Sequence, residues 1–109
     1  MSLTIVNRTP IFEAIDAERD RQDRIHPGTT RIPDGTGGTG YETYREIARI
    51  RCDRAQREGR LTHAHYFEEE VWEVLAETDP EKLRTELVQV AACCVKWVEE
   101  LDRRARGGA

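Results

Sequence analysis

Apolar residues recur at helical spacing in four segments of the chain, which cover residues 9–26, 41–58, 62–77 and 79–104. Intervals of three and four residues mark one face of an α-helix, whereas a half-buried strand would alternate. We find no convincing strand pattern and no internal repeat. The pattern therefore predicts an all-α fold in a single domain that spans residues 1–109.

Local signals indicate where these helices begin. Thr9 followed by Pro10 is typical of a helix start, because Thr can cap free N–H groups and Pro at the first position loses no needed donor. Thr62 is a candidate cap for the third helix, and Asp79 followed by Pro80 is the strongest start signal in the chain. Since the link between the last two helices is very short, we expect them to pack antiparallel.

Residues 27–40 read PGTTRIPDGTGGTG and are interpreted as a loop. Gly-rich loops can cradle phosphates, but that use needs a preceding strand and a Lys-Ser/Thr pair, and neither is present. The simplest interpretation is a flexible connector. A lid over a substrate is the alternative, because loops of this length are often functional.

Composition narrows the range of partners. Apolar residues make up 38% and charged residues 35% of the 109 positions, which is polar for a chain that must fill its own core. A second copy would add the burial that a small domain lacks. Acids dominate the second half of the chain and the net charge is -4, and both observations argue against nucleic-acid binding. The arginines within residues 45–57 nevertheless leave nucleic-acid binding open as an alternative function, ranked below the two that are described later in this section.

Three cysteines, Cys52, Cys93 and Cys94, do not suit a disulfide framework, because their number is odd and two are adjacent. We interpret them as small core residues. No signal peptide precedes the domain and no apolar run approaches the length that spans a membrane. We therefore expect a cytoplasmic protein that does not enter membranes.

Carboxylates gather on one flank of each of the last two helices. On a wheel of about 100° per residue, these flanks hold Glu69, Glu70, Glu73 and Glu77 on the third helix, and Glu86 beside Gln89 on the fourth. Two carboxylates about 6 Å apart repel by roughly 2–3 kcal/mol at an effective dielectric near 20. Mg²⁺ suits such a cluster, because it is often bound by a few carboxylates together with substrate phosphates. The competing interpretation is a solvated face, which is the usual fate of a run of Glu.

Two strings in these helices match a known signature. The first is Glu69-Glu70-Val71-Trp72-Glu73 and the second, twelve residues later, is Glu86-Leu87-Val88-Gln89. Together they resemble the E-E-x-x-E … E-x-x-D signature of MazG-like nucleotide pyrophosphohydrolases. Further likeness to a subgroup of short MazG-like proteins of actinobacteria and their phages lies at residues 18–23, 33–37 and 59–62.

The resemblance implies a bundle of four to five α-helices that assembles as a homodimer or homotetramer. It also implies hydrolysis of a nucleoside triphosphate to the monophosphate and pyrophosphate with Mg²⁺, or with Mn²⁺ in its place. By position, Glu70, Glu73 and Glu86 match metal ligands. Glu69 matches the other acid of the motif, which orients or deprotonates the attacking water or holds a second metal. Gln89 stands where the signature has Asp, and its amide offers a carbonyl oxygen without charge. The alternative function is therefore a non-catalytic MazG-like module that binds a nucleotide or a protein.

Cations and one aromatic residue near the carboxylates are candidates for holding the substrate. Arg45 or Arg49 of the second helix, or Lys96 of the fourth, could hold phosphates. Trp72 borders the carboxylates and offers a face on which a base could stack, although aromatics at helical spacing are usually core residues.

Overall fold

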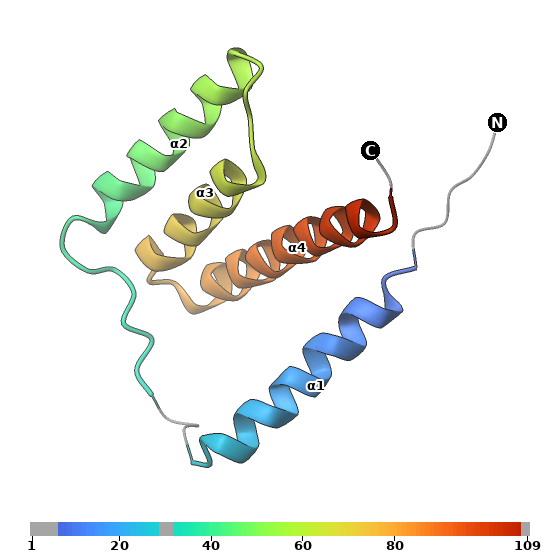
Figure 1. The fold of residues 1–109 in the computed structure, drawn as a ribbon. Coiled ribbons are helices and arrows are strands. Elements are labelled where there is room, and N and C mark those ends of the chain that lie inside the picture. Colours follow the sequence, from blue (N-terminus) through green and yellow to red (C-terminus); the bar gives the residue numbers. More distant parts are fainter. Residues whose placement is uncertain (1–6, 29–31, 108–109) are drawn as a thin grey trace. The chain divides into compact units, whose positions relative to one another are not determined.

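A computed structural model describes residues 7–28 and 32–107, which contain four α-helices and no strand (Figure 1). The helices are α1 (Thr9–Ile25), α2 (Tyr41–Arg57), α3 (His63–Ala76) and α4 (Pro80–Ala105). The all-α prediction is confirmed for this part of the chain, and the bounds lie close to those expected. Within the same residues, no helix combines the length and apolar character needed to cross a bilayer.

The chain divides into two compact units. One consists of residues 34–97 and holds α2, α3 and most of α4. The other consists of the described parts of residues 1–33 and 98–109, where Arg8 of the N-terminal part forms an ion pair with Glu99 at 2.6 Å. All the site residues predicted from the sequence lie in the unit of residues 34–97, and the single domain over residues 1–109 stays a prediction.

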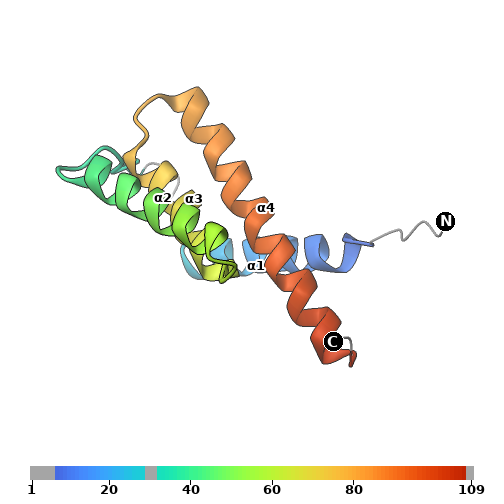
Figure 2. The same cartoon turned by 90° about the horizontal axis from the view of Figure 1, so that it is seen from above.

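α2 and α3 lie side by side within residues 34–97 (Figure 1), and the view from above shows the same pairing (Figure 2). Three small residues of α2 are buried: Ala48 and Cys52 are 2% exposed, and Ala55 is 0% exposed. Their spacing places them on one face of the helix. Because these side chains are small, the two helices can approach closely, and we call Ala48, Cys52 and Ala55 the small-residue stripe.

Ion pairs show that α2 and α3 run in opposite directions. Arg45, early in α2, lies 3.7 Å from Glu73 in the second half of α3. Arg51, in the second half of α2, lies 3.4 Å from Glu68 in the first half of α3. This register sets the small-residue stripe against the segment of α3 that carries the clustered acids.

α3 and α4 also run in opposite directions within residues 34–97, as the short link predicts, and aromatic side chains connect them. His63 at the start of α3 stacks on Trp97 far along α4, with the ring centroids 5.6 Å apart. At the other end, the charge of Glu77 just after α3 raises the pKa of Glu86 near the start of α4. The flanks that bear Glu70 and Glu86 therefore belong to neighbouring segments.

Most of the helix starts follow the sequence signals, with one exception. Thr62 caps α3 through its side chain, and Asp79 Oδ2 accepts a hydrogen bond of 3.0 Å from the backbone N–H of Lys82. Thr9 does not cap α1, because it already lies in the helix. Asn7 accepts a hydrogen bond of 3.0 Å from the Thr9 N–H instead.

The loop between α1 and α2 is anchored at one point within its described residues. The N–H of Gly37 donates to the carbonyl oxygen of Leu75 at 2.8 Å. Gly37 has a φ of 75°, and a Cβ atom at this position would overlap the Thr78 side chain. The loop is therefore not a free connector here, and part of the segment predicted to be flexible, residues 29–31, lies outside the described residues.

Only part of the apolar face of α4 is buried. Leu83 and Val95 are buried, whereas Leu87, one helical turn after Leu83, is 50% exposed. Spacing identifies an apolar face but does not say which part of it another element covers. Part of the apolar surface of α4 is therefore exposed among the described residues.

Candidate metal and substrate site

α3 presents the predicted acids Glu69, Glu70 and Glu73, all of them half-buried. The Oε2 atom of Glu70 is buried and has no hydrogen-bond partner. Burial raises the pKa of Glu70, and the charges of Glu69 and Glu73 raise it further. A buried acceptor left without a partner costs about 1–3 kcal/mol, and more when it is charged. A cation that binds this carboxylate would therefore stabilise it.

α4 adds Glu86 to the same group of charges. Its Oε2 atom is also buried without a hydrogen-bond partner. Burial is the main cause that raises the pKa of Glu86, followed by the charges of Glu77 and Glu73, whereas Arg45 lowers it and Glu70 raises it slightly. The three predicted metal ligands are therefore near enough to act on one another electrostatically.

The arrangement fits a divalent cation in its chemistry, although the side chains are not yet gathered around one point. Among residues 7–28 and 32–107, no three His, Cys, Asp or Glu side chains already form a group that could hold a metal ion. The two partnerless oxygens of Glu70 and Glu86 are nevertheless the kind of ligand that Mg²⁺ prefers, and phosphates and waters usually complete its shell.

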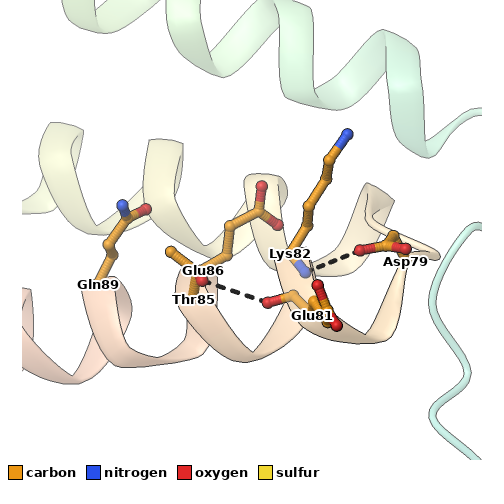
Figure 3. Close-up of a pocket in the computed structure, with 6 residues that line it drawn as sticks. All are labelled: Asp79, Glu81, Lys82, Thr85, Glu86 and Gln89. Atoms are coloured by element: carbon orange, nitrogen blue, oxygen red, sulfur yellow. Dashed lines mark hydrogen bonds between the residues drawn. The ribbon is translucent and has the colours of Figure 1, made fainter.

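The first turns of α4 line a pocket of about 360 Å³ (Figure 3). The lining residues are Asp79, Glu81, Lys82, Thr85, Glu86 and Gln89. Lys82, Glu86 and Gln89 rise from the same side of the helix in this view. Gln89 therefore lines the same pocket as Glu86. Lys82 adds a positive charge to this pocket that the sequence analysis did not predict. It could have been predicted from its position one helical turn before Glu86, because residues at this spacing lie on the same face of a helix.

Arg45 and Arg49 differ in what they contact. Arg45 pairs with Glu42 on its own helix and also lies 3.7 Å from Glu73. Arg49 pairs with Glu46 at 2.5 Å, and this hydrogen bond is the main cause that raises the pKa of Arg49. Arg45 thus forms an ion pair with Glu73, while Arg49 pairs along α2 and is influenced by the charge of Glu73 without an ion pair to it. The arginines of α2 are interleaved with acids rather than gathered into a basic face.

Trp72 and Lys96 both contact tyrosines. Trp72 stacks on Tyr44 with the ring centroids 4.9 Å apart and meets the edge of Tyr41 at 5.6 Å. One face of Trp72 is therefore occupied by Tyr44, which is itself 52% exposed. The Lys96 Nζ atom lies over the ring of Tyr66, 5.5 Å from its centroid. Burial, together with Cys94 and Glu70, raises the pKa of Cys93, which follows Gln89 by one turn, and the charge of Lys96 opposes this shift.

The thiol of Cys52 lies next to the acids of α3. Cys52 is buried, as predicted for a small core residue. Burial and the neighbouring acids Glu69, Asp53 and Glu70 raise the pKa of Cys52 to about 12. The thiol is therefore protonated at neutral pH. Sequence spacing gave no signal for this contact, because it depends on the register of two helices.

Comparisons with known proteins identify no relative. No family model matches the chain, and neither a curated protein nor a solved structure matches it. The case for a function therefore depends on the residues themselves and on their arrangement.

Proposed function

We propose that this chain is a MazG-like, Mg²⁺-dependent pyrophosphohydrolase that converts a nucleoside triphosphate into the monophosphate and pyrophosphate. The observation that carries the proposal is the pair of buried carboxylate oxygens without hydrogen-bond partners, on Glu70 and Glu86. Most buried polar side-chain atoms in proteins have a partner. Carboxylates with raised pKa values and no donor, on the two strings of the signature, are typical of a functional site.

Glu70, Glu73 and Glu86 would hold the ion, and the amide oxygen of Gln89 would be a neutral fourth ligand. Mn²⁺ accepts the same oxygen ligands. When bound, the ion supplies charge neutralisation on the phosphate oxygens and makes a bound water more acidic. With Gln in place of Asp, the site has one negative charge fewer than the signature, so we expect weaker binding of Mg²⁺.

The residues around these ligands would divide the chemistry among them. Water attacks the α-phosphorus, the bond from that phosphorus to the bridging oxygen breaks, and pyrophosphate leaves with the bridging oxygen. Glu69 accepts the proton of the water and returns it to solvent. Arg45 and Lys82 pair with the charges of the phosphates. Lys96 and Arg49 would contribute only after they leave Tyr66 and Glu46 respectively.

The base would stack on the aromatic pair formed by Trp72 and Tyr44. Their rings are already parallel to within 26°, and Tyr44 is half exposed. An aromatic face accepts any base, so this contact supports binding of a nucleotide without selecting one.

Assembly into a homodimer or homotetramer is part of the proposal. Leu87 is 50% and Val88 is 56% exposed on α4, and the buried residues of the described chain include few large side chains. A second copy that covers this part of α4 would add apolar burial. A cytoplasmic location is also proposed, because three free cysteines suit a reducing compartment.

A non-catalytic MazG-like module is the second candidate function. The observation that favours it is Arg45, which lies 3.7 Å from Glu73 and already brings a positive charge to the carboxylates. Together with the neutral Gln89, this cation would allow the fold to bind a nucleotide or a protein without a metal.

The test is release of pyrophosphate from a panel of ribo- and deoxyribonucleoside triphosphates, with Mg²⁺, with Mn²⁺ and with chelator. Wild type should release pyrophosphate only with metal. Glu73→Gln should lose this activity while its far-UV circular dichroism is unchanged. Glu68→Gln is the matched control and should stay active, because Glu68 pairs with Arg51 away from the proposed ligands. Full activity in Glu73→Gln would refute the assignment, and a folded, inactive wild type would leave the binding module as the better function.

A further inference from the structure

Arg45 is shared between two acids on different helices. Its guanidinium pairs with Glu42 on α2 and lies 3.7 Å from the carboxylate of Glu73 on α3. The second distance is longer than an ordinary hydrogen bond, so this contact is ionic and can be exchanged without the loss of a hydrogen bond. The Arg45 side chain is 32% exposed, whereas those of Arg49 and Arg51 are 54% and 66% exposed. Arg45 is therefore the most buried of these three arginines of α2.

The three proposed metal ligands differ in what surrounds them. Glu70 and Glu86 each have a buried oxygen atom without a hydrogen-bond partner. Glu73 instead has the positive charge of Arg45 beside it. Burial and the charges of neighbouring acids raise the pKa of Glu86, and the charge of Arg45 opposes this shift. Arg45 therefore acts on acids of both α3 and α4, and a divalent cation held by these acids would be repelled by it.

We propose that Arg45 is the counter-ion of the metal-free site, and that it exchanges the carboxylate of Glu73 for a phosphate of the nucleotide when a divalent cation binds. This inference rests on the proposed function, because it takes Glu73 as a metal ligand. Glu42 precedes Arg45 by three residues on the same helix, so the two side chains lie on one face. Arg45 can keep this pair while its guanidinium turns away from Glu73.

The exchange couples the two ligands of the site. In the metal-free protein, Arg45 competes with the cation for Glu73 and is not available to a phosphate. When the cation takes over Glu73, the guanidinium is released and can donate two parallel hydrogen bonds to phosphate oxygens. Coupling between two binding sites is reciprocal, so a phosphate that holds Arg45 also favours binding of the cation.

Removal of the guanidinium should change the two affinities in opposite directions. Arg45→Gln should bind Mn²⁺ alone about fivefold more tightly than wild type, because a half-exposed ion pair no longer competes for Glu73. In saturating Mn²⁺, the same variant should bind a non-hydrolysable nucleoside triphosphate analogue about tenfold more weakly, because a charge-assisted hydrogen bond is lost. Electron paramagnetic resonance of free Mn²⁺ measures the first affinity, and calorimetry measures the second.

Arg51→Gln is the matched control. It removes the same charge from α2 and also breaks an ion pair with α3, but the partner of Arg51 is Glu68, which is not a proposed ligand. Both affinities should therefore stay within about twofold of wild type, because solvent and salt screen a charge that is not in contact with the site.

A readout without metal or nucleotide tests the ion pair itself. In chelator, Arg45→Gln should lower the urea midpoint of wild type by more than it lowers the midpoint of Glu73→Gln, because the second protein has already lost the partner. Such non-additivity is the signature of two residues that interact directly. Equal effects in the two backgrounds would show that Arg45 is not the counter-ion of Glu73.

The outcomes separate this inference from the proposed function. Equal Mn²⁺ affinity in wild type and Arg45→Gln, or an equal gain in Arg51→Gln, would overturn the competition. An unchanged affinity for the analogue would overturn the exchange. Pyrophosphate release by wild type would stand in either case. If wild type neither binds Mn²⁺ nor releases pyrophosphate, the proposed function and the exchange both fail, and non-additive urea midpoints would leave only the ion pair.

Discussion

Replacing Glu70 by Gln should stabilise the protein in chelator and destabilise it, relative to wild type, in excess Mg²⁺. The reason is that Glu70 is half-buried among Glu69 and Glu73, and its Oε2 atom has no hydrogen-bond partner. Without a cation, its negative charge is unfavourable. With Mg²⁺ in the proposed site, the same carboxylate is a ligand of the ion and its negative charge is favourable.

The size of the effect follows from the charges. Two carboxylates about 6 Å apart repel by roughly 2–3 kcal/mol at an effective dielectric near 20. Water and salt screen this half-exposed site, so the net relief in Glu70→Gln should be about 1 kcal/mol. In a domain near this size, that free energy raises Tm by roughly 4–8 °C. Mg²⁺ at about 100 times its Kd stabilises wild type by about 2.7 kcal/mol, and Glu70→Gln should lose most of this gain.

Thermal unfolding followed by circular dichroism, in chelator and in Mg²⁺, tests this reasoning. The order of the two Tm values should reverse between the two conditions. Glu68→Gln is the control and should keep the Mg²⁺-induced rise, because Glu68 pairs with Arg51. A lower Tm of Glu70→Gln in chelator, or an equal Mg²⁺ shift in both proteins, would refute the idea that Glu70 belongs to a cation site.

Three further predictions concern stability. Since the pKa values of Glu70 and Glu86 are raised above 4.5, the folded metal-free protein binds more protons than the unfolded chain just above that pH. Its free energy of unfolding should therefore fall, relative to the double Gln variant of these residues, as pH rises through this window. Urea unfolding of both proteins measures this, and a constant difference would contradict it. Gly37→Ala should destabilise more than Gly35→Ala, since both have positive φ but only Gly37 has a side chain against its Cβ position; equal urea midpoints would rule this out. Asp79→Ala should cost about 1 kcal/mol through loss of the α4 cap, and an unchanged Tm would show that the cap contributes nothing.

Helix starts were predictable because they depend on local chemistry. Asp79 followed by Pro80 marks the start of α4 regardless of what the helix packs against. Burial was harder to predict, because it depends on which element covers a face. Leu87 has the right spacing for the core and is half exposed, whereas the small side chains of Ala48 and Ala55 are buried.

In the candidate site, too, some features could be predicted from the sequence and others could not. Helical spacing and the short link between α3 and α4 were enough to expect Glu70 and Glu86 on neighbouring flanks. The contacts that α2 makes were not predictable, because one helical turn of register decides whether Arg45 reaches Glu73 and whether Cys52 reaches an acid. Sequence patterns within each helix contain no information about that register.

The most direct test of the central claim is the anomalous scattering of Mn²⁺ in crystals grown with a non-hydrolysable nucleoside triphosphate analogue. The proposal predicts an anomalous peak ligated by Glu70, Glu73 and Glu86, with phosphate oxygens of the analogue completing the shell. An analogue bound without Mn²⁺ at these residues, with Glu73 still paired to Arg45, would contradict it.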